Sequence, residues 1–123
     1  MERVIDLDEL AGLLTRRTAY WRASGLDVGR TTWRDAGAAW PQPLVADRAG
    51  VPDPDSLGLV VRGPAEAELS VVVFRGGWAD VDFMADPDDA GVLPASEISG
   101  APDFARRMDG WVHRVFGVPG SGT

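Results

Sequence analysis

Two stretches of the chain repeat apolar side chains at the spacing of an amphipathic helix. In the first, from Asp6 to Ser24, the apolar positions are Leu7, Leu10, Leu13, Leu14, Tyr20 and Trp21. Asp6 or Asp8 can cap the start of this helix, and Gly25 suits the position after its end. In the second stretch, which Gly117 can end, the apolar positions are Phe104, Met108, Trp111, Val112 and Val115. We therefore expect one helix near each end of the chain.

Between the predicted helices lie runs of β-branched and aromatic residues that favour strands. Three of these runs are Leu57 to Arg62, Glu66 to Arg75 and Trp78 to Met84. Gly63-Pro64-Ala65 separates the first two, and Gly76-Gly77 can form a two-residue hairpin turn between the last two. Leu26 to Arg34 is a further candidate strand, weakened by its glycine. The pattern predicts an antiparallel sheet of three to four strands.

A two-residue turn at Gly76-Gly77 would pair Arg75 with Trp78 and so fix which side chains share a face of the sheet. One face would then hold apolar side chains from all three strands: Leu57, Leu59, Val61, Val72, Phe74, Ala79, Val81 and Phe83. The two helices carry the apolar stripes that can cover this face. We therefore predict an α+β fold in which the N-terminal and the C-terminal helix pack on one face of the sheet.

The remaining segments are rich in proline and glycine and predict connections. Asp35 to Ser56 is expected to be a long loop, fixed to the body by Trp40 and Leu44. Asp86 to Ala101 is expected to connect the sheet to the second helix. We predict a single domain over residues 1–117 and a flexible tail over residues 118–123.

The charge balance and the lack of cysteine exclude several classes of partner and site. Nineteen acidic and twelve basic residues give a net charge of -7, which argues against nucleic acid and anionic membranes as partners. Without cysteine there is no disulfide and no thiolate metal site. The first residues lack the basic and apolar stretches of a signal peptide, and no run approaches the roughly 20 apolar residues that span a bilayer. We expect a cytoplasmic protein.

The other face of the predicted sheet combines aliphatic and acidic side chains. It would carry Leu69, Val71, Val73 and Arg75 on one strand and Trp78, Asp80, Asp82 and Met84 on the next. Carboxylates resist burial, and neither a core nor an ordinary solvated face has this composition. The pattern indicates a docking surface for a basic partner. The alternative is that the loop of residues 35–56 folds over this face.

Two groups of residues that could support chemistry are explained more simply without it. The segment from Asp86 to Glu97 partly matches a calcium-binding loop, but Ala90 has no oxygen ligand where one is needed, and Pro87 lies inside the loop. A solvated acidic turn explains it better. The single histidine, His113, is spaced to form an ion pair with Asp109 on its helix. We predict no metal, no cofactor and no catalytic residue.

Three segments together resemble a known family. A helix ending W-x-x-S-G is followed by a hairpin A-E-L-S-V-V-V-F-R-G-G-W-A-D-V-D-F-M and by a closing helix R-R-M-D-G-W-V-H-R-V. This arrangement, from Leu10 to Val115, resembles the small immunity proteins of bacterial polymorphic-toxin systems, most nearly the TriTu type. The resemblance implies a non-enzymatic inhibitor that binds a cognate toxin in the producing cell.

Our first hypothesis is therefore an immunity protein that neutralises a basic toxin domain. The expected partner-binding residues are Trp78, Asp80 and Asp82 at the centre, Asp86, Asp88 and Asp89 as a rim that attracts the partner, and Arg75, which orients the aspartates. A secretion chaperone or adaptor that holds an exported partner is the alternative. A small enzyme that uses carboxylates is a third hypothesis, and an exposed strand edge could also form a homodimer.

Overall fold

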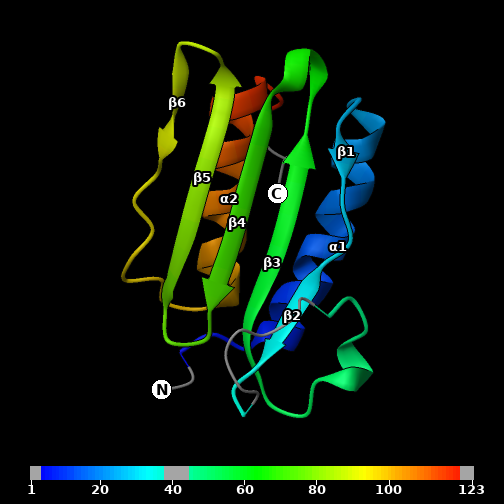
Figure 1. Cartoon of the computed structure of the whole chain (residues 1–123), viewed down its shortest axis with the longest axis vertical. Helices are drawn as coiled ribbons and strands as arrows, with labels where there is room; N and C mark the ends of the chain where they lie inside the picture. Colours follow the sequence, from blue (N-terminus) through cyan, green and yellow to red (C-terminus); the bar gives the residue numbers. More distant parts are fainter. Residues whose placement is uncertain (1–3, 38–44, 120–123) are drawn as a thin grey trace.

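The protein consists of one antiparallel sheet and two helices that lie on the same side of it (Figure 1). The computed structural model describes residues 4–37 and 45–119. The helices are α1 (Leu7–Ala23) and α2 (Ala101–Phe116), and the strands are β1 (Asp27–Val28), β2 (Thr32–Asp35), β3 (Pro54–Arg62), β4 (Glu68–Phe74), β5 (Trp78–Asp86) and β6 (Asp89–Val92). This confirms the α+β class, with six strands in place of the three to four expected. No helix in the described ranges is long and apolar enough to cross a membrane.

The helix ends follow the predicted capping residues. The side chain of Asp6 accepts hydrogen bonds from the amides of Asp8 and Glu9, and Gly25 follows α1 with φ +93°. At the other end of the chain, Gly117 adopts the left-handed conformation and donates to the carbonyl of His113. The predicted pair between His113 and Asp109 does not form, because Asp109 instead binds Arg17 of α1 at 3.1 Å. This ion pair links the two helices.

The order of the strands is β1-β3-β4-β5-β6, and β2 also pairs with β3. The predicted strand Leu26 to Arg34 is thus divided into β1 and β2, interrupted at Gly29, whose amide donates to the carbonyl of Val60. Asp86 to Ala101, predicted as a connection, contains the end of β5 and all of β6, which fold back on each other around Pro87-Asp88. The strands concerned are short and lie next to residues typical of turns, so the sequence pattern predicted neither the break at Gly29 nor β6.

The hairpin between β4 and β5 has a three-residue turn, so the predicted two-residue turn is wrong. Phe74 pairs with Trp78, the amide of Gly77 donates to the carbonyl of Phe74 at 3.1 Å, and Gly77 has φ +101°. On its other side, β4 pairs Val73 with Leu57. Relative to both neighbours, β4 is therefore shifted by one residue from the predicted register.

The shift exchanges the two faces of β4. Leu69, Val71 and Val73 lie in the core, whereas Val72 and Phe74, predicted to be buried, lie on the opposite face. The predictions for the neighbouring strands are confirmed: Leu57, Leu59, Val61, Ala79, Val81 and Phe83 face the helices. Apolar residues occupy both faces of β4, so its hydrophobic pattern does not by itself define a register.

The described part of the long loop packs at the edge of β2, beside α1. Trp33 is buried and pairs with Val45, and Val51 is also buried. The guanidinium of Arg48 lies 5.2 Å from the ring centre of Trp33. The predictions for Trp40 and Leu44 fall outside the described residues, as does the predicted tail from residue 120 onward.

The observed register gives a direct test on β4. We expect Val73→Ala to lower the free energy of unfolding by about 2 kcal/mol, because it opens a cavity in the core. Val72→Ala, the matched control on the opposite face, should cost less than about 1 kcal/mol. Urea denaturation of both variants measures the difference. Equal losses, or a larger loss for Val72→Ala, would contradict the register.

Candidate functional site: the open face of the sheet and the groove beside β5

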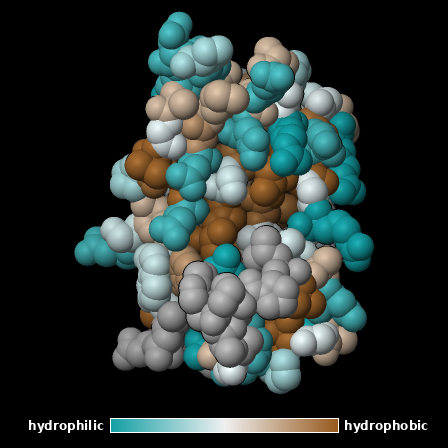
Figure 2. Space-filling view, in the orientation of Figure 1, coloured by the Kyte–Doolittle hydropathy of each residue, from teal (hydrophilic) through white to brown (hydrophobic). Residues whose placement is uncertain are grey.

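The face of the sheet that points away from the helices combines apolar, small and acidic side chains; we call it the open face. Side chains alternate along each strand, so paired residues form rows across the sheet. Three rows of the open face are Trp78–Phe74–Ser56–Arg34, Asp80–Val72–Gly58–Thr32 and Val92–Asp82–Ser70–Val60. Figure 2 shows this face, with hydrophobic residues at its centre and many hydrophilic residues above the centre and along its sides.

Two aromatic rings form a flat platform at one end of the open face. Trp78 and Phe74 stack with their ring centres 4.9 Å apart and their planes at 13°. The turn at Gly77 directs the first residue of β5 outward, and 40% of the surface of Trp78 is exposed. A large aromatic side chain held flat and exposed is a typical anchor of a binding surface.

Asp80 and Asp82 project from β5 next to this platform, as predicted. Both are exposed, and neither forms an ion pair or a side-chain hydrogen bond with any residue that the structure describes. Their cross-strand neighbours on β4 are Val72 and Ser70, which carry no charge. The open face therefore presents two unneutralised carboxylates beside an apolar centre.

A groove of about 460 Å³ runs along β5 between these side chains and the chain from the last residue of β6 onward. One wall is formed by residues 78–82 and the other by residues 92–96. Val92 is 72% exposed, pairs with Asp82 and stands at one end of the groove. Trp78 stands at the other end.

Smaller hollows lie on the strands beside the groove. A hollow of about 100 Å³ lies over Ser56, Gly58 and Ser70, and one of about 210 Å³ lies between Ser70 and Met84. Gly58 is constrained, because a Cβ atom there would lie 2.6 Å from the hydroxyl oxygen of Thr32. Small side chains thus lower the centre of the open face relative to its margins.

The other predicted site residues lie elsewhere. The prediction that Arg75 orients the aspartates is wrong: it follows Val73 on the helix side and binds Asp53 at 2.8 Å. The three acidic residues predicted as a rim, Asp86, Asp88 and Asp89, surround the β5–β6 turn. Along a strand that rises about 3.3 Å per residue, Asp86 is roughly 26 Å from Trp78.

One of the three carboxylates at the acidic turn, that of Asp89, is paired with a guanidinium. Asp89 forms two hydrogen bonds with the guanidinium of Arg114, at 2.7 and 2.9 Å, and these hold the pKa of its carboxyl below the ordinary value. Arg114 lies 5.0 Å from the ring centre of Phe83. The turn therefore fixes β6 to the end of α2, at the opposite end of β5 from Trp78.

The residue pattern did not predict that Val72, Phe74, Ser70 and Val92 belong to the open face. One signal was available on β4: Glu68 and Ser70 are its two polar residues and share a face, which argues for placing that face away from the core. No comparable signal marked Val92, because its strand is short.

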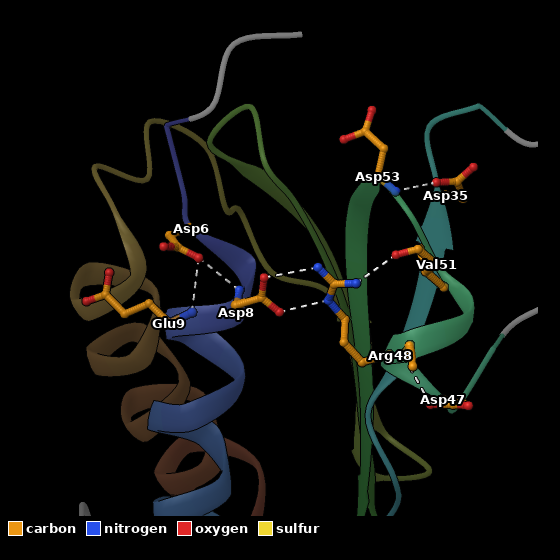
Figure 3. Close-up of polar contacts among 9 residues, drawn as sticks. Asp6, Asp8, Glu9, Asp35, Asp47, Arg48, Val51 and Asp53 are labelled. Atoms are coloured by element: carbon orange, nitrogen blue, oxygen red, sulfur yellow. Dashed lines mark hydrogen bonds and ion pairs between the residues drawn. The ribbon is translucent and has the colours of Figure 1, made fainter.

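A second concavity, of about 400 Å³, lies between the start of α1 and the described end of the long loop. Figure 3 shows Arg48 reaching from this loop to Asp8 on α1, with hydrogen bonds of 2.8 and 3.1 Å, and to the carbonyl of Val51. Arg75 and Asp53 pair within the same cleft. The charged side chains of this cleft are paired with each other, and the Arg48–Asp8 pair holds the loop against α1. In the groove beside β5, by contrast, the carboxylates have no described partner.

Neither concavity offers a set of metal ligands. Among residues 4–37 and 45–119, no three histidine or carboxylate side chains converge in a way that could hold a metal ion. Of the described residues that line the groove, Asp80 and Asp82 are the two with carboxylates. The arrangement is suited to binding a cationic group through charge and an apolar group through contact area.

No family model matches the chain, and no curated protein and no solved structure matches it. The surface chemistry of the open face is therefore the main indication of function.

The cleft at α1 gives a prediction for acid stability. Hydrogen bonding by Arg48 lowers the pKa of Asp8 below 3.8, so this ion pair stabilises the fold above that pH and the contribution disappears as pH falls through the lower, folded-state value. On acidification below pH 3.8, we expect the free energy of unfolding to fall less in Asp8→Asn than in wild type. Because the pair is exposed, this difference should be less than about 1 kcal/mol. Thermal unfolding followed across pH, with Glu9→Gln as control, measures this. An unchanged acid slope in Asp8→Asn would refute it.

Proposed function

We propose that this protein is a non-enzymatic inhibitor that binds a basic bacterial toxin domain through its open face, in the cytoplasm of the producing cell. The observation that carries the proposal is the pair of exposed carboxylates, Asp80 and Asp82, which lack a described partner and stand beside an apolar and aromatic surface. A cationic partner would neutralise the carboxylates, and its apolar groups would cover Phe74 and Trp78.

The charge of the whole chain supports the same partner. A net charge of -7 attracts a basic domain over a distance and raises the rate of association. The apolar centre of the open face then supplies contact area that long-range attraction does not. The arrangement therefore combines a fast encounter with a stable contact, which an inhibitor of a toxin requires.

A secretion chaperone or adaptor is the second candidate, and the apolar hollows at Gly58 and Ser70 favour it. Such a protein would hold a short apolar segment of an exported partner and would depend little on charge. A carboxylate enzyme has less support, because Asp80 and Asp82 stand side by side on an exposed strand. Catalytic carboxylates usually face each other across a cleft, with one of them kept protonated by burial.

Charge reversal on β5 tests the proposal. We expect Asp80→Arg combined with Asp82→Arg to leave the fold intact and to weaken binding of the toxin domain by at least 2 kcal/mol, which is about thirty-fold. The assay expresses this protein together with the product of the neighbouring gene and measures bacterial growth and the affinity of the purified complex. Glu9→Arg, which reverses an exposed charge on α1, serves as the matched control.

The outcomes separate the candidate functions. Growth protected by wild type and by Glu9→Arg but lost in the double variant supports the inhibitor. If the double variant still binds tightly, Asp80 and Asp82 do not contribute to binding. This result favours a chaperone that recognises apolar groups. A neighbouring product that neither inhibits growth nor binds this protein contradicts the proposal.

A further inference from the structure

The groove beside β5 has walls of two different kinds. One wall belongs to a regular strand, Trp78–Asp82, and the other is formed by Val92 at the end of β6 and the irregular segment of residues 93–96. Backbone hydrogen bonds already join the walls: the amide of Leu93 donates to Val81, and the amide of Ala79 donates to Ala95. Because this edge of β5 is occupied, a partner cannot add a strand to it. Recognition in the groove must come from side chains.

The side chains of β5 that line the groove have a fixed period. Trp78, Asp80 and Asp82 occupy alternate positions of one strand, so successive members are roughly 6.6 Å apart. An extended peptide that runs along β5 repeats its own side chains with the same period and can match all three. Side chains on one face of a helix recur every three or four residues, with Cβ atoms about 5–6 Å apart, and lose this match over the length of the groove.

From this match we infer that the groove binds an extended basic segment of the partner, with two cationic side chains two residues apart paired to Asp80 and Asp82. The next position in the same direction is apolar and packs on the ring of Trp78. The expected pattern is thus apolar, any, basic, any, basic, in either chain direction. This inference rests on the proposed function and adds the conformation and spacing of the recognised segment.

A second copy of this chain does not provide such a segment. Its twelve basic residues include the adjacent pairs Arg16-Arg17 and Arg106-Arg107, but no two basic residues are separated by one position. Two copies would also bring together chains that each carry a charge of -7. The charge complementarity of the groove therefore points to a different protein.

Three synthetic peptides test the inference on the intact protein, by calorimetry and by NMR shifts of the Trp78 indole. The first contains leucine-serine-lysine-serine-lysine, and the second has the same composition with the lysines adjacent. The third is an alanine-rich helical peptide with lysines four residues apart. We expect the first to bind at least about fivefold more tightly than the second, because only one lysine of the second can reach the groove.

Single variants locate the effect. Asp80→Asn and Asp82→Asn should each remove the preference for alternate lysines, whereas Glu9→Gln should retain it. Equal affinity for the two isomeric peptides, or tighter binding of the helical peptide, overturns the inference. Loss of toxin neutralisation on charge reversal, with no preference among the peptides, would leave the proposed inhibitor in place and reject the extended segment. If the protein prefers the first peptide but charge reversal leaves toxin neutralisation unchanged, the extended segment is supported and the proposed inhibitor is rejected.

Discussion

The register of β4 is the constraint on which the rest of this structure depends. A central strand has a neighbour on each side, and a slip of one residue exchanges all of its buried and exposed side chains. Here the three-residue turn before Trp78 places Val71 and Val73 under the helices. A Cβ atom on Gly77 would lie 3.0 Å from the carbonyl oxygen of Ile98 and 3.4 Å from Val4, so the turn is also where two other segments meet. Its geometry is therefore fixed from several directions.

With that register, the sheet has two faces of different character. The helix side is a closed core, in which even the link between the helices, Arg17 with Asp109, is mostly buried. The open face has apolar residues on β4, small residues on β3 and β4, and acidic residues on β5. Sheets of this kind normally pair a buried face with a uniformly polar one. The mixed composition, together with carboxylates that nothing in the described chain neutralises, is what distinguishes this protein from a generic two-layer domain.

Local patterns predicted much of this architecture. The helix caps at Asp6 and Gly117 and the alternation of exposed and buried residues over 78–82 in β5 each specify their element without reference to the rest of the chain. The direction of Trp78, Asp80 and Asp82 follows from that alternation, so the centre of the candidate site could be predicted from sequence. The position of Arg75 could not, because it depends on the length of the turn beside it. The apolar part of the site was assigned to the wrong face for the same reason, and β6 was too short to recognise.

The two walls of the groove differ in how freely their sequences can change. Substitutions in β5 disturb the core through Ala79 and Val81, whose side chains lie on the helix side. In the opposite wall, only Ala95 is buried, and Val92, Pro94 and Ser96 are exposed. Mutations there can reshape the rim of the groove at little cost to folding. For the proposed inhibitor, this means that the choice of partner can change through residues 92–96 while Asp80 and Asp82 on the facing strand stay the same.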